Sequence, residues 1–208
     1  WRSSFTTSTC RPEVSSRSFA AALAGALDSP VLLTRPGGLP SATVAELERL
    51  DPARVVVLGG PGAVSDVVLA QASAAAGVPA ERVYGTNRYG TAAAVAGEFG
   101  TAERVFVATG VDYPDALSAA ARAGAVDSPV LLVRRDSIPS ATAAALDALD
   151  PSQITVLGGE GAVDQSVVEE LRAWAPTQRM GGLNRYVTSV RLFAEVASAE
   201  TVYVASGQ

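Results

Sequence analysis

The stretch V-L-G-G-P-G-A-V at residues 57–64 returns as V-L-G-G-E-G-A-V at residues 156–163, an offset of 99 residues. In both copies an apolar run of strand length meets a glycine-rich turn, the pattern of a strand that leads into a helix. Self-similarity at a fixed period is the signature of a protein built from packed repeats. The fold is therefore predicted from the repeating unit.

Further segments recur around this stretch. At the offset of 99 these are S-P-V-L-L (29–33, 128–132) and L/I-P-S-A-T (39–43, 138–142). At an offset of 97 they are G-x-N-R-Y-x-T (85–91, 182–188) and V-F/Y-V-A-T/S-G (105–110, 202–207). One unit is thus just under 100 residues long, and a two-residue deletion lies between Val163 and Gly182.

The repeats predict four segments. Residues 1–17 do not match the repeat and are left unassigned, and residues 18–82 form the later part of a first unit. Residues 83–179 form a complete unit, and residues 180–208 open a following one. Packing between these units is expected because a single repeat cannot cover its own apolar surface.

Helices and strands alternate along the unit. Ala-rich segments predict helices at 91–99 and 115–124, and further helices are predicted at 142–149 and 164–174, with N-caps at Thr91, Asp115 and Asp164. Apolar runs predict strands at 104–108, 130–133 and 154–157, and at Val31–Leu33 in the first unit. Strands that are apolar throughout belong to parallel sheets buried on both faces. The predicted fold class is α/β, with tandem Rossmann-like repeats whose parallel sheets are covered by helices on both faces.

The composition excludes several function classes. The sequence has no His, all 16 of its basic residues are Arg, and Cys10 is its single cysteine. The commonest general base, metal ligand and Schiff-base amine are therefore missing, and neither a cofactor nor a metal is expected. The net charge of −5 argues against nucleic acid as a partner, and no apolar run is long enough to span a membrane.

The glycine-rich loops at 59–62 and 158–161 resemble an anion cradle at a helix N-terminus. The third glycine of a dinucleotide-binding loop is absent, and Glu160 and Asp164 would repel a phosphate. A tight turn with an ordinary N-cap is the favoured interpretation.

The N-R-Y-x-T motif supplies the main candidate binding residues: Asn87, Arg88, Tyr89 and Thr91, with their copies Asn184, Arg185, Tyr186 and Thr188. A guanidinium for an anionic group beside a phenol that stacks on a sugar ring suits a charged glycan. The alternative is that the arginine ties the helix start to a neighbouring unit and the tyrosine fills the seam.

Two further sets complete the candidates. Asp112 and Asp115 could bind a cation or sugar hydroxyls, although an N-cap is the favoured role for Asp115. Arg134 and Arg135 follow an apolar strand, as Arg35 does in the first unit, and provide local positive charge on an acidic chain. A solvated loop is their alternative.

The linked motifs resemble the cell wall binding repeat 2 family of surface proteins from Gram-positive bacteria and actinobacteria, over Ala20 to Gly207. The resemblance implies Rossmann-like repeats, usually three around a pseudo-threefold axis, and an extracellular location at the cell wall. It implies non-catalytic anchoring of a surface or secreted protein to an anionic polysaccharide or teichoic-acid-like polymer. The family's hydrophobic triplet near its anchoring determinant matches 31–33 and 130–132. Two alternatives remain: a self-packing module of a surface layer, and a nucleotide- or sugar-binding enzyme domain.

Overall fold

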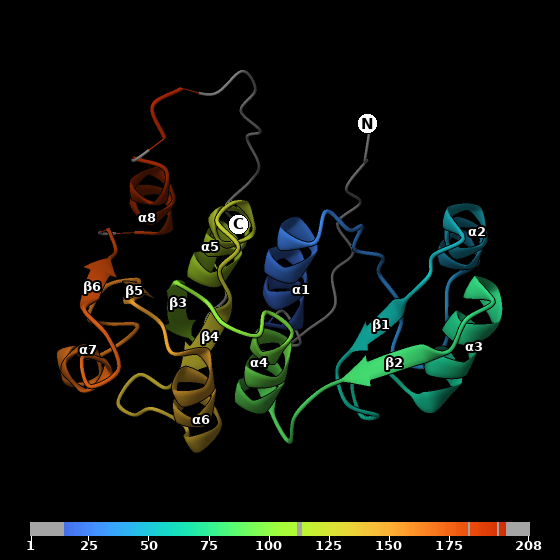
Figure 1. The fold of residues 1–208 in the computed structure, drawn as a ribbon, viewed down its shortest axis with the longest axis horizontal. Helices are drawn as coiled ribbons and strands as arrows, with labels where there is room; N and C mark the ends of the chain where they lie inside the picture. The colour runs from blue at the N-terminus through green and yellow to red at the C-terminus, as the bar shows by residue number, and fades with distance from the viewer. Residues whose placement is uncertain (1–14, 112–113, 183, 195, 199–208) are drawn as a thin grey trace.

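The computed structural model describes residues 15–111, 114–182, 184–194 and 196–198, and Figure 1 shows their arrangement. The helices are α1 (Ser15–Ala26), α2 (Ser41–Leu50), α3 (Asp66–Ala76), α4 (Arg88–Gly97), α5 (Pro114–Ala125), α6 (Ser140–Leu149), α7 (Gln165–Leu171) and α8 (Arg185–Leu192). The strands are β1 (Val55–Leu58), β2 (Ala80–Val83), β3 (Arg104–Thr109), β4 (Val130–Val133), β5 (Gln153–Leu157) and β6 (Thr177–Met180).

The strands form two parallel sheets. The larger has the order β4-β3-β5-β6, with Phe106 paired to Val130 and Val105 paired to Ile154. In the smaller sheet β1 pairs with β2, and these strands lie with α2 and α3 at one end of the molecule (Figure 1). Parallel strands need crossover connections, and the helices that alternate with the strands provide them.

Helices cover both faces of the larger sheet because β3, β4 and β5 carry buried apolar side chains on both sides. On one face Val105 and Val107 of β3 pack in a cluster with residues of α6 and α7. On the other face Phe106 and Ala108 pack with residues of α1, α5 and α8, while α4 contributes to both clusters. Burial of such side chains is the main favourable term in folding. The predicted α/β fold class is confirmed.

The helix pairs reproduce the sequence repeat. Three helices of the first part, α1, α2 and α3, begin 99 residues before α5, α6 and α7, and α4 begins 97 residues before α8. The equivalent helices α1 and α5 pack side by side (Figure 1), and a Cβ at Gly25 would lie 3.0 Å from the Cα of Gly124. These two glycines are themselves 99 residues apart. Their lack of a side chain allows the close approach of the two helices.

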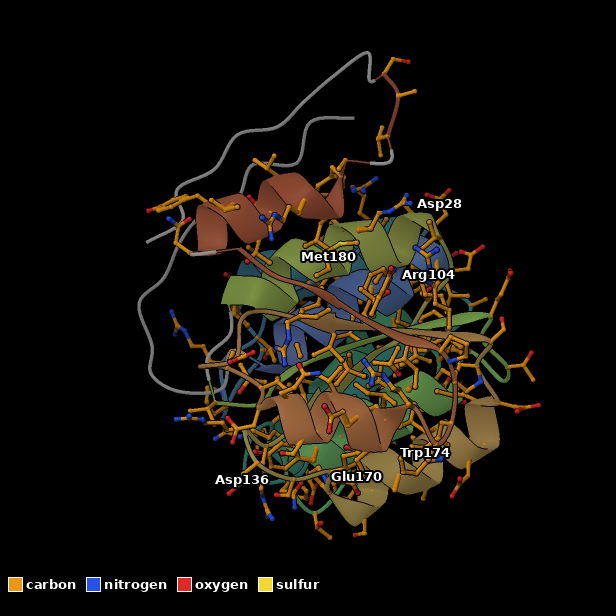
Figure 2. All side chains as sticks on the ribbon, turned by 90° about the vertical axis from the view of Figure 1, so that its left-hand side faces the viewer. Asp28, Arg104, Asp136, Glu170, Trp174 and Met180 are labelled. Atoms are coloured by element: carbon orange, nitrogen blue, oxygen red, sulfur yellow. The ribbon has the colours of Figure 1, made fainter. Side chains whose placement is uncertain are left out.

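Side-chain bonds tie the helices of the complete unit together. Trp174, just after α7, donates its indole N–H to Asp147 of α6 at 2.6 Å, and Figure 2 shows Trp174 between these two helices. Thr142 of α6 is fully buried and donates its hydroxyl to the Leu132 carbonyl at 2.6 Å. Because β4 is an edge strand, this hydroxyl satisfies a carbonyl that no neighbouring strand can reach.

The prediction of a strand at Val31–Leu33 is wrong, because these residues have no strand structure. Val31 is 43% exposed and Leu33 is 53% exposed, whereas their counterparts in β4 are almost fully buried. Among the described strands, β4 pairs with β3 alone. The counterpart of β3 in the first unit would be residues 5–10, which lie outside the described part. Without a described partner strand, an apolar run is not sufficient to form a ladder.

Three other elements, β2, β6 and α1, differ from the predictions. The strands β2 and β6 were missed because their sequences, A-E-R-V and T-Q-R-M, are not apolar runs. The helix α1 begins within the segment that the repeat pattern left unassigned. No helix in the described residues is long and apolar enough to cross a membrane.

Candidate functional site

The predicted binding residues meet where β3 and β4 end. Gly110 directly follows β3, Arg134 directly follows β4, and the first turn of α4 brings Arg88 and Tyr89 to the same edge. Ligands of open parallel α/β sheets bind at the carboxyl ends of the strands. We call Arg88, Tyr89, Gly110 and Arg134 the carboxyl-edge cluster.

The ring of Tyr89 packs against the backbone of Gly110. A Cβ added to this buried glycine would lie 2.5 Å from Cε1 of Tyr89 and 3.1 Å from its hydroxyl oxygen. The ring also packs against the apolar cluster that contains Phe106 and Ala108. Glycine is thus the residue that leaves room for the ring.

Two guanidinium groups flank this tyrosine. Arg88 donates from Nη1 to the Gly110 carbonyl at 2.6 Å. The Cζ atom of Arg134 lies 5.7 Å from the centroid of the Tyr89 ring, within the range of a cation–π interaction. Both arginines are exposed, so the edge presents positive charge and an aromatic ring to solvent.

The other two residues of the first N-R-Y-x-T motif make bonds within the chain. The prediction that Thr91 caps α4 is wrong, because the N-cap is Asn87, whose Oδ1 accepts from the N–H groups of Tyr89 and Gly90. Asn87 has the extended backbone of an N-cap residue, whereas Thr91 lies inside the helix. Thr91 is buried, and its hydroxyl accepts from the Gly85 N–H at 3.1 Å.

The second copy of the motif repeats this local structure. Asn184 is the N-cap of α8, and the hydroxyl of buried Thr188 accepts from the Gly182 N–H at 3.0 Å. Tyr186 is 57% exposed, in contrast to half-buried Tyr89. The side chain of Arg185 lies outside the described residues.

The remaining candidate arginines differ in their partners. Arg135 donates from Nε to Asp164 at 2.9 Å, and this hydrogen bond raises the pKa of the Arg135 guanidinium above its ordinary value. The exposed Arg35 forms an isolated backbone bridge with Gly38. The cluster therefore includes Arg134, whereas Arg135 is bonded to Asp164, the N-cap residue of α7.

Asp112 lies outside the described residues. Asp115 belongs to the first turn of α5, which begins at Pro114, and its side chain also lies outside the described part. Within the described part of the chain, no group of three or more His, Cys, Asp or Glu residues could hold a metal ion.

The predictions missed two arginines that hold the glycine-rich loops. Arg82 donates from Nη1 to the carbonyls of Gly59 and Val64, both at 2.7 Å, and pairs with Asp66. Arg179, which is 97 residues later, makes equivalent bonds to the carbonyls of Gly158 and Val163. The recurrence of this arginine was a signal in the sequence. These bonds fit the interpretation of the loops as tight turns.

The comparisons with known proteins agree with this architecture. The sequence model of cell wall binding domain 2 (CWB2) matches residues 18–69 and 82–168. The chain is 32% identical over 189 residues to the N-acetylmuramoyl-L-alanine amidase LytC of Bacillus subtilis (strain 168), covering 90% of this chain and 37% of LytC. It is 28% identical over 186 residues to the amidase enhancer of the same organism, covering 89% of this chain and 25% of that protein.

Two solved structures share the fold. Cwp6 from Clostridium difficile superposes with a TM-score of 0.79 at 25% identity, covering 88% of this chain and 30% of Cwp6. Cwp8 from the same organism gives a TM-score of 0.77 at 25% identity, covering 88% of this chain and 31% of Cwp8. The chain thus spans between a quarter and two fifths of each relative's length. The family resemblance predicted from the motifs is confirmed: this chain belongs to the cell wall binding domain 2 family.

Proposed function

We propose that the chain is a non-catalytic module that anchors a surface or secreted protein to an anionic polymer of the bacterial cell wall. The observation that carries this proposal is the carboxyl-edge cluster, where two exposed guanidinium groups flank Tyr89. A charged polysaccharide or teichoic-acid-like polymer offers oxyanions for arginine and sugar faces for an aromatic ring. Membership of a cell wall-binding family supports the wall as the source of this polymer.

The charge distribution supports an ordered site over a general attraction. The whole chain has a net charge of −5 and would be repelled, on average, by an anionic polymer. Binding then depends on local positive charge, which Arg88 and Arg134 place at one strand edge. We therefore expect affinity for the polymer to fall as salt screens these charges.

A non-catalytic role agrees with the composition and with the relatives. The sequence has neither His nor Lys. The matches to an amidase and to an amidase enhancer cover only 37% and 25% of those proteins, so a shared anchoring part attached to different partners accounts for both. We assign 18–82, 83–179 and 180–208 to successive anchoring repeats, as the sequence offsets predict.

Co-sedimentation with purified actinobacterial walls tests the proposal. The folded chain should sediment with intact walls and stay in solution with walls stripped by acid of their secondary anionic polymer. Circular dichroism of the same sample establishes that the protein is folded. Equal retention on intact and stripped walls would rule out the anionic polymer as the ligand.

One observation favours a second role, packing within a surface layer. Four apolar or aromatic side chains along α8 and the residues after it are exposed: Tyr186, Val190, Phe193 and Val196. Their counterparts in and after α4 are at least partly buried. A module that assembles through this surface should show a sedimentation coefficient that rises with protein concentration in the absence of walls.

A further inference from the structure

The arginines near the carboxyl edge are not equally available to a ligand. Arg88 already donates to the Gly110 carbonyl at 2.6 Å, and Arg135 is paired with Asp164 at 2.9 Å. The guanidinium of Arg134 has the Tyr89 ring as its partner and pairs with no carboxylate among the described residues. No described residue accepts a hydrogen bond from this guanidinium, which leaves its N–H donors available for a ligand.

Three residues, Asn87, Gly110 and Arg88, fix the position of Tyr89 next to Arg134. Asn87 caps the first turn of α4, on which Tyr89 lies. The ring rests on Gly110, and Arg88 ties the carbonyl of this same glycine to the helix start. A side chain held in one position loses less conformational entropy when a ligand binds.

The cation–π contact leaves Arg134 suited to one kind of ligand. A guanidinium at 5.7 Å from a ring centroid interacts through its charge, and this contact uses none of its N–H donors. These donors form a planar fork that binds two oxygens of a phosphate or carboxylate group together. A lysine at this position would supply the charge without the fork.

The equivalent position of the first unit lacks this arrangement. Arg35, which is 99 residues before Arg134, is exposed and contacts no aromatic ring within the described part. Arg35 adds positive charge, but no described aromatic ring positions its guanidinium. Arg35 is therefore a suitable control for Arg134, because it has the same charge and occupies the equivalent position of the repeat.

We propose, resting on the function proposed above, that Arg134 is the residue that contacts the oxyanion of the wall polymer and that Tyr89, Arg88 and Gly110 position it. The ligand group is a phosphodiester or a carboxylate bound by two oxygens, next to a sugar ring. Arg88 contributes to this positioning by its hydrogen bond to the carbonyl of Gly110, the residue against which the Tyr89 ring packs.

Binding isotherms on intact walls, measured at several salt concentrations with folded variants, test this assignment. Arg134→Gln should weaken binding about tenfold or more and flatten the salt dependence, because it removes a charged hydrogen bond. Arg134→Lys should weaken binding and leave the salt dependence unchanged. Tyr89→Leu should weaken binding about two- to fivefold, and Tyr89→Phe should weaken it less because it keeps the ring. Arg35→Gln should change binding by less than about twofold.

Soluble competitors identify the oxyanion. Displacement of the wild type from walls by sodium polyphosphate alone assigns the phosphodiester, and displacement by polygalacturonate alone assigns the carboxylate. Displacement by both leaves the shared oxyanion fork as the recognised feature, and displacement by neither overturns it.

The two proposals fail in different ways. If the wild type binds intact walls and Arg134→Gln binds with the same affinity and salt dependence, the role of Arg134 is overturned and wall anchoring stands. If the folded wild type does not bind intact walls, the proposed function itself is overturned.

Discussion

Because the ring of Tyr89 packs against Gly110, the substitution Gly110→Ala is a sharp test of the carboxyl-edge cluster. The new Cβ would lie 2.5 Å from Cε1 and 3.0 Å from Cζ of the ring, closer than packed carbon atoms approach. The ring must therefore leave its position, or β3 must shift. Overpacking of this kind costs about 1–3 kcal/mol. At about 2–4 °C per kcal/mol for a chain of this size, thermal unfolding should begin several degrees lower.

Gly161→Ala provides the matched control, because a Cβ at Gly161 would meet nothing within 4 Å. Its free energy of unfolding should change by less than about 0.5 kcal/mol. Both variants are measured by urea denaturation followed by circular dichroism, and each is also made in a Tyr89→Ala background. Removal of the ring should relieve the cost of Gly110→Ala, giving a coupling free energy of about 1–2 kcal/mol. Equal stability of the two alanine variants, or no coupling to Tyr89, would refute this account of the cluster.

Three other predictions concern hydrogen bonds and ion pairs outside the carboxyl-edge cluster. Thr142→Val should lower the free energy of unfolding by about 1–3 kcal/mol, because the Leu132 carbonyl loses its buried donor. The control Thr43→Val should lower it less, because water can reach the acceptor of Thr43, the carbonyl of exposed Leu33. Equal losses of the two variants in urea denaturation would contradict this prediction. Arg82→Met should cost about 1–3 kcal/mol because it leaves two loop carbonyls without their donor. Arg49→Met, which breaks an exposed pair, should cost less than Arg82→Met. The hydrogen bond from Arg49 holds the pKa of Glu46 below its ordinary value of 4.5, so its stabilisation is present above pH 4.5 and is lost as the pH falls through the lowered pKa. Arg49→Gln should therefore flatten the dependence of thermal stability on pH below 4.5, and an unchanged dependence would argue against this pair.

The predictable parts of the fold are those where an apolar run in the sequence forms a strand that the sheet buries on both faces. The runs that form β3 and β4 are apolar at residues 105–108 and 130–133, and they lie in the middle and at the edge of a sheet covered on both faces. The same pattern failed at Val31–Leu33, because a strand also needs a partner and sequence alone does not supply one. In contrast, β6 forms from a polar sequence because β5 provides a ladder for it.

The site was predictable in its residue types but not in its assembly. The N-R-Y-x-T motif and Arg134 were separate candidates, since only the sheet order places the ends of β3 and β4 beside each other. The role of Gly110 depends on a contact with Tyr89, 21 residues earlier, that no local pattern encodes. The choice of Asn87 over Thr91 as the N-cap was visible in principle, because asparagine is a strong N-cap residue.

Direct titration of the wall polymer tests the central claim most closely. The anionic polymer is released from walls by muramidase digestion, purified, and titrated into the folded chain in a calorimeter at low and high salt. The account predicts saturable binding that weakens as the salt concentration rises, because arginines at the carboxyl edge hold oxyanions. Absence of binding, or binding of equal strength at both salt concentrations, would contradict it.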